Sequence, residues 1–196
     1  MPDQSRPGFG GIWSWLPWVA YFVVGNMGYR PVGAFVALAA ATYPVVRARN
    51  SGSSIKMPDA AAAIFFALAS AAIVIGGSAG AWFWRYNFVI VWAVFTAGAW
   101  GSILVGSPFT IAFARESTPP EVWEAPLFRK TNLIITTVWA LMFTGNLIAM
   151  LMIVGATGFA AWIPLIGPTL TMGVAIVFTT RYAAYVQRVA ATSPST

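Results

Sequence analysis

The sequence contains no cysteine and no histidine. Without cysteine there can be no disulfide, iron–sulfur cluster, thiolate metal ligand or cysteine nucleophile. Without histidine, the Ser-His and Cys-His catalytic pairs, the common zinc sites and histidine ligation of haem or chlorophyll are excluded too. Much of ordinary enzyme chemistry is therefore excluded by composition. We predict a protein that is not an enzyme and that has no catalytic residues, metal ion or cofactor.

Charged residues are scarce as well. They make up 8% of the 196 residues, whereas 59% of the residues are hydrophobic. A water-soluble domain normally carries about 25% charged residues, so most of the surface of this chain cannot face water. The prediction is an integral membrane protein. Because hydrocarbon offers no hydrogen-bond partners, its peptide groups must be satisfied within helices.

Apolar segments of membrane-spanning length recur along the chain. A bilayer core about 30 Å thick requires roughly 20 residues of helix. We predict an all-α membrane bundle of about six helices in one domain, residues 1–196, with helices at 12–26, 32–46, 59–77, 86–105, 133–154 and 159–180. The first two segments are short. They either cross the membrane as two tilted spans or enter one leaflet as a helical hairpin.

The basic residues indicate how these segments are oriented. With six spans and a cytoplasmic amino terminus, only Arg30 and Arg85 belong to the outer loops. The cytoplasmic side holds the other nine: Arg6, Arg47, Arg49, Lys56, Arg115, Arg129, Lys130, Arg181 and Arg188. Since cytoplasmic loops are enriched in Lys and Arg, this bias predicts cytoplasmic termini, and the hairpin alternative is compatible with it. The scattered basic residues form no continuous face, which argues against nucleic-acid binding.

We call the longest polar stretch, residues 107–130, the elbow. It holds three acidic and three basic residues, and we predict that it lies along the cytoplasmic interface as an amphipathic segment. Thr118 and Glu121 have the spacing of a capping box, and Pro126 is expected to end the short helix that they begin. These charges are more typical of a solvated ion network than of catalysis. The candidates for contact with a partner or with lipid are Arg115, Glu116, Glu121, Trp123, Arg129 and Lys130.

Polar side chains within the predicted spans are amides and hydroxyls. No ionisable residue lies in the middle of a span, which argues against a pump or an intramembrane enzyme. The candidates for intramembrane polar contacts are Asn87, Asn132 and Asn146. Asn146 needs a partner, which is either a group on a neighbouring helix or a lipid or quinone-like ligand. The stripe that it forms with Trp139, Met142 and Phe143 is more typical of a helix seam than of a cofactor site.

Several short motifs resemble those of one bacterial family. They are Leu16-Pro17 at the start of an aromatic segment, Arg47 and Arg49 at the end of a small-residue segment, the elbow pattern Pro108…Glu116…Pro120…Trp123, and Trp139-Ala140-Leu141-Met142-Phe143 followed by Asn146. In these features residues 12–180 resemble, in divergent form, the intracellular septation protein A family. The resemblance implies a small inner-membrane protein of the cell envelope. It also implies a link to septation and to partner proteins that build the wall, with no assigned catalysis.

Three functions are compatible with these observations. The first is a non-enzymatic protein of the bacterial inner membrane that binds membrane lipids or other membrane proteins and helps to organise the envelope or septum. The second is a carrier or channel for a neutral or hydrophobic small molecule, which requires no buried charge. The third is an accessory subunit of a larger energy-converting membrane complex. We expect the first, and the sequence does not choose among them by itself.

Overall fold

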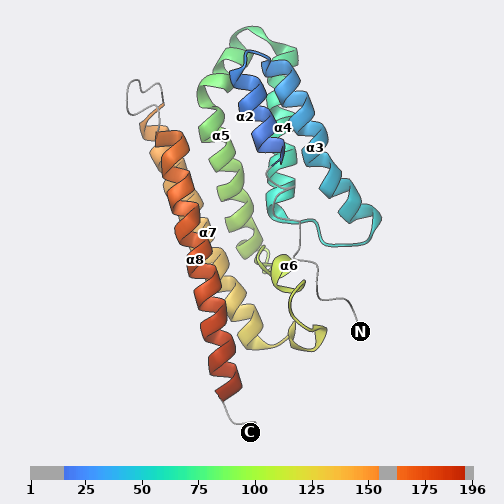
Figure 1. Cartoon of the computed structure of the whole chain (residues 1–196), viewed down its shortest axis with the longest axis vertical. Helices are drawn as coiled ribbons and strands as arrows, with labels where there is room; N and C mark the ends of the chain where they lie inside the picture. The colour runs from blue at the N-terminus through green and yellow to red at the C-terminus, as the bar shows by residue number, and fades with distance from the viewer. Residues whose placement is uncertain (1–15, 155–162, 193–196) are drawn as a thin grey trace. The chain divides into compact units, whose positions relative to one another are not determined.

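The computed structural model describes residues 16–154 and 163–192, and every regular element within them is helical (Figure 1). In chain order the elements are α2 (Leu16–Asn26), α3 (Arg30–Asn50), α4 (Met57–Ile75), α5 (Gly77–Leu104), α6 (Ile111–Ala114), the 3₁₀ helix η1 (Pro120–Val122), α7 (Pro126–Met152) and α8 (Ile163–Thr192). Among the described residues, α3, α4, α5 and α7 are long and apolar enough to cross a membrane. The all-helical prediction is confirmed for these residues, and the four helices indicate a membrane protein. The number of six spans stays a prediction.

The helices extend beyond the apolar segments that predicted them. α3 runs from Arg30 to Asn50, although its apolar segment covers residues 32–46. α5 begins at Gly77 rather than at residue 86, so the expected outer loop around Arg85 is helical. α7 begins at Pro126, the residue that was expected to end a helix. Proline suits the first position of a helix, because the amide hydrogen that it lacks would have no intrahelical partner there.

The predicted first and last spans lie partly outside the described residues. From the segment 12–26 the structure describes α2, whose 11 residues cover about 16 Å, roughly half of a bilayer core. The 21 residues of α3 cover about 31 Å, which is enough to cross. From the segment 159–180 the structure describes α8, which begins at Ile163 and continues for 30 residues to Thr192. Within the described residues, α2 is therefore about half as long as α3, its partner in the predicted hairpin.

The chain divides into two compact units, Met1–Asn87 and Phe88–Thr196, with the boundary inside α5. In the first unit, α2 packs on α3 and α3 packs on α4 (Figure 1). One face of α3 buries the small residues Gly33, Ala34, Ala37 and Ala41. A Cβ on Gly33 would lie 3.2 Å from the backbone nitrogen of Gly25, so the two helices approach at backbone distance. Small residues permit this approach where lipid provides no hydrophobic drive between helices.

Aromatic rings fill the interior of the first unit. Phe65 and Phe66 of α4 are only 1% and 0% exposed. Trp18 of α2 stacks on Phe65 with ring centroids 5.3 Å apart, and Tyr21 stacks on Trp84 of α5 at 5.6 Å. The Arg30 guanidinium at the start of α3 lies 5.1 Å from the centre of the Trp84 ring. The beginning of α3 and the Trp84 turn of α5 therefore meet at one end of this unit.

The second unit is built around α7. α8 and α6 both pack on it, and α7 and α8 run side by side (Figure 1). Phe143 of α7 is 3% exposed and lies at the centre of an aromatic cluster. Its neighbours, with ring centroids between 5.2 and 6.5 Å away, are Trp92, Phe95, Phe109 and Trp139. Part of the predicted Trp139 to Asn146 stripe is thus a packing seam.

Candidate functional site

A pair of buried threonines fixes the elbow to α7. Thr110 directly precedes α6, and its hydroxyl oxygen lies 2.8 Å from the hydroxyl oxygen of Thr136 on α7. The Thr110 hydroxyl also donates to the backbone carbonyl of Asn132 at 3.0 Å. Thr136 is 0% exposed. Because buried hydroxyl groups need partners, these two bonds position the start of the elbow against α7.

Trp123 holds the other side of the elbow. Its indole N–H donates to the backbone carbonyl of Thr118 at 3.0 Å, and the Arg115 guanidinium lies 4.8 Å from the centre of a Trp123 ring. Two of the predicted contact residues are therefore stacked on each other. A stacked cation of this kind contributes about 0.5–1 kcal/mol at an exposed site.

The predicted capping box of the elbow is wrong. η1 has no side-chain capping bond, and the Thr118 hydroxyl donates backwards to the carbonyl of Ala114 at the end of α6. A threonine hydroxyl can bond either to a carbonyl four residues earlier or to an amide at the start of a following helix. The spacing of Thr118 and Glu121 does not decide between the two geometries.

The charges of the elbow are exposed and balanced in sign. Glu124 and Arg129 form an ion pair, with 73% and 60% of their side chains exposed. Pairs of this kind contribute at most about 1 kcal/mol, so a binding partner can rearrange this one cheaply. Glu116, Glu121 and Lys130 are also at the surface. The three acidic and three basic residues leave the elbow with no net charge.

Large apolar side chains lie among these charges. Phe113 of α6 is 40% exposed, Val122 of η1 is 39% exposed and Leu127 at the start of α7 is 46% exposed. An ordered surface that mixes exposed apolar groups with both signs of charge has the composition expected of the rim and core of a protein interface. The sequence identified the charged residues of this surface and Trp123, but not Phe113, Val122 or Leu127.

The predicted intramembrane amides find their partners in two different ways. Asn146 is 5% exposed, and its amide nitrogen donates to the Thr171 hydroxyl on α8 at 2.9 Å. Asn132 donates to the Phe128 carbonyl and Asn87 donates to the Trp84 carbonyl, both within their own helices. Within the described part of the chain, Asn146 is the one of the three candidates whose side chain bonds to a neighbouring helix.

Two further polar bonds join α7 to its neighbours. The Trp139 indole donates to the Thr179 hydroxyl on α8, and the Trp100 indole on α5 donates to the Thr144 hydroxyl, both at 3.0 Å. On α8, Thr171 and Thr179 are eight residues apart, and on α7, Trp139 and Asn146 are seven residues apart. Each spacing is about two helical turns, so each pair lies on one face of its helix, as two antiparallel helices require. That matched spacing is the signal in the sequence from which this pairing could have been inferred.

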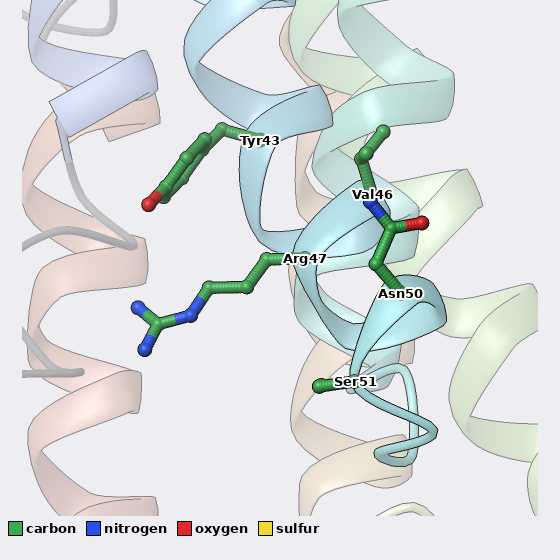
Figure 2. Close-up of a pocket in the computed structure, with 5 residues that line it drawn as sticks. All are labelled: Tyr43, Val46, Arg47, Asn50 and Ser51. Atoms are coloured by element: carbon green, nitrogen blue, oxygen red, sulfur yellow. The ribbon is translucent and has the colours of Figure 1, made fainter.

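An open hollow lies at the carboxyl end of α3, in the first unit (Figure 2). Its volume is about 410 Å³, and it is lined by Tyr43, Val46, Arg47, Asn50 and Ser51. Figure 2 shows the Tyr43 ring and the Arg47 guanidinium extending from α3 to the same side. In the sequence Arg47 is a topology signal and part of the motif resemblance, and neither predicts a hollow beside it.

The last turn of α3 is capped within the chain. The amide of Gly52 donates to the Arg49 carbonyl at 3.4 Å, and the amide of Ser53 donates to the Ala48 carbonyl at 2.9 Å. Gly52 has φ +67°, the left-handed conformation that this pair of bonds requires and that glycine adopts without steric cost. Because backbone amides satisfy these carbonyls, the basic side chains of the turn are not needed to cap them.

Among the described residues, no group of three or more acidic side chains could hold a metal ion. Comparison of the chain with family models, with curated proteins and with solved structures finds no match. The resemblance to the septation protein A family therefore stays a prediction from the sequence motifs.

Proposed function

We propose that this chain is a non-enzymatic, multi-pass membrane protein that binds another membrane-associated protein through the elbow. The single observation that carries the proposal is that the elbow is held from within while its outer residues are exposed. Thr110 and Trp123 make the internal contacts, and Phe113 and Val122 are 40% and 39% exposed. A surface that is ordered before binding loses less conformational entropy when a partner docks.

The charge balance of the elbow favours a protein partner over a bare lipid surface. Anionic headgroups attract segments with an excess of Lys and Arg, and each excess basic residue contributes about 1 kcal/mol. The elbow has no such excess, because its three acidic residues offset its three basic ones. Charges of both signs instead suit a partner that presents a complementary pattern, which contributes mainly to specificity.

We also propose the location that the sequence predicts. The nine basic residues on one side against two on the other favour a bacterial inner-membrane protein with both termini in the cytoplasm. The motif resemblance favours a role in organising the septum or the envelope. Fusion of a reporter enzyme after Lys56 and after the carboxyl terminus tests the orientation, since both fusions should report the cytoplasm.

Site-specific photo-crosslinking in cells tests the docking proposal. A photoreactive amino acid replaces Phe113 or Val122, and the products are separated by mass after irradiation. We expect a discrete protein adduct from both positions. The control position is Val174 on α8, which is 71% exposed and should react only with lipid or detergent. Lipid adducts alone from Phe113 and Val122 would contradict protein docking at the elbow.

A pair of tryptophan variants tests whether the shape of the elbow matters. Trp123→Ala removes the stack on Arg115 and the bond to Thr118, so the adduct from Phe113 should be lost. Trp82→Ala is the matched control, because Trp82 is 59% exposed on α5 and lies outside the elbow. Equal loss in both variants would point to general misfolding and not to a docking surface.

Fewer observations support the carrier and accessory-subunit alternatives. A polar path for a carrier would use Asn146, whose amide is engaged by Thr171 in a helix contact. An accessory subunit should co-purify in fixed ratio with a larger partner, and mass spectrometry after gentle solubilisation would detect it.

A further inference from the structure

The hollow at the end of α3 lies on an exposed face of that helix. Tyr43, Val46, Arg47 and Asn50 are separated by three, four and seven residues, so they share one helix face. The buried residue Ala41 lies about 200° around the helix from Tyr43. Tyr43 is 66% exposed and Val46 is 53% exposed, although both are large side chains.

The residues of the hollow change from apolar to polar along the helix axis. Tyr43 and Val46 come first, Arg47 follows, Asn50 ends the helix and Ser51 comes directly after it. These residues span about 12 Å along the axis, at the end of a helix about as long as a bilayer core is thick. An anchored phospholipid shows the same order from its acyl chains through its phosphate to its headgroup.

The surroundings of the hollow are cationic. Arg47 and Arg49 lie in the last turn of α3, and the next acidic residue in the sequence is Asp59, in the first turn of α4. This differs from the elbow, whose charges cancel. The carbonyls of Ala48 and Arg49 are capped by backbone amides, so the Arg47 guanidinium, which points to the Tyr43 side, can bind an anion.

We propose that this hollow binds the phosphate of an anionic phospholipid. The Arg47 guanidinium donates to the phosphate oxygens, and the Tyr43 ring, which extends to the same side of α3, contacts the beginning of the acyl chains. A soluble phosphate compound would use the guanidinium but would have no use for the exposed ring, which is why a lipid is the expected occupant. The inference rests on the proposed membrane location but not on the elbow or its partner.

Two arginine variants separate a site from a general attraction. Arg47→Gln and Arg49→Gln remove the same charge from the same helix turn, but only Arg47 lines the hollow. The full chain is reconstituted in nanodiscs of phosphatidylcholine with increasing phosphatidylglycerol, and native mass spectrometry counts the phosphatidylglycerol molecules retained. Loss of a surface cation should weaken retention roughly fivefold in both variants. Loss of the guanidinium hydrogen bond should weaken it about tenfold more in Arg47→Gln alone.

A loss about tenfold greater in Arg47→Gln than in Arg49→Gln, with equal thermal unfolding of the two variants, supports the lipid site. Equal losses, or no preference of the unaltered protein for phosphatidylglycerol, overturn it. Displacement of bound phosphatidylglycerol by millimolar inorganic phosphate would overturn the lipid in favour of a soluble anion. Protein adducts at Phe113 are unaffected by any of these results, so the lipid site and the elbow can fail separately.

Discussion

The close approach of α4 and α5 gives the sharpest test of the packing. Gly80 is buried in the first turn of α5, and a Cβ placed on it would lie 3.0 Å from the backbone carbonyl oxygen of Ala72 on α4. This distance is shorter than in nine of ten real Cβ contacts, and the neighbouring atom belongs to the backbone, so a helix must shift by a few tenths of an ångström to relieve it. The two helices are joined at Gly76 and Gly77, so they cannot separate without changing that turn.

The expected magnitude for Gly80→Ala follows from two opposing effects. Alanine in a helix interior is favoured over glycine by about 1 kcal/mol. Overpacking of a tight contact costs about 1–3 kcal/mol. Gly145→Ala is the matched control, since Gly145 is exposed on α7 and its Cβ would meet nothing within 4 Å. The difference between the two changes in the free energy of unfolding should therefore be about 1–3 kcal/mol, with Gly80→Ala the less stable protein.

Reversible unfolding in mixed micelles measures both variants. The unaltered chain, Gly80→Ala and Gly145→Ala are unfolded by increasing the fraction of a denaturing detergent, and helix content is followed by circular dichroism. Gly145→Ala should unfold at the same or a higher fraction than the unaltered chain. If the two variants unfold at the same point, the Gly80 contact with Ala72 does not limit the helix approach and the reasoning is refuted.

Three further predictions concern hydrogen bonds and a helix end. Asn146→Leu and Thr171→Val should each lower the free energy of unfolding, and a double-mutant cycle should give a coupling of about 0.6 kcal/mol, at most about 1.7; additive effects would contradict the bond. Thr110→Val should speed amide hydrogen exchange in the elbow, whereas Thr137→Val, whose hydroxyl bonds within its own helix, should not. Gly52→Ala should cost about 1–2 kcal/mol because φ there is +67°, and faster exchange confined to the end of α3 would report it.

Comparison of the observed helices with the predicted apolar segments shows which helix ends hydropathy predicts correctly. Hydropathy predicted both ends of α4 and the end of α7 closely, because a long apolar run in a chain this poor in charge can only be stable as a buried or lipid-facing helix. It misjudged the start of α5, where Trp82 and Arg85 were taken for loop residues. A helix continues past the hydrocarbon edge wherever its side chains can reach the interface, so the end of an apolar run is not the end of a helix.

The candidate sites were predictable to different degrees. The charged residues of the elbow stand out in the sequence as the longest interruption of apolar character. The stacking of Arg115 on Trp123 and the bond from Thr110 to Thr136 do not, because each depends on how the chain folds between positions that are 8 and 26 residues apart. The hollow beside Arg47 also required the structure, since Tyr43 and Asn50 are ordinary residues for the end of a membrane helix.

What the sequence determined by itself is the environment of this protein. Its lack of cysteine and histidine excludes thiol and imidazole chemistry, and its sparse charge and long apolar runs lead to helices in a membrane, since these are properties of composition and of short windows of chain. Tertiary structure decided which polar groups meet. The register of neighbouring helices brings Asn146 to Thr171, and it also brings Gly80 close to the Ala72 carbonyl. That register depends on side-chain packing over many residues at once.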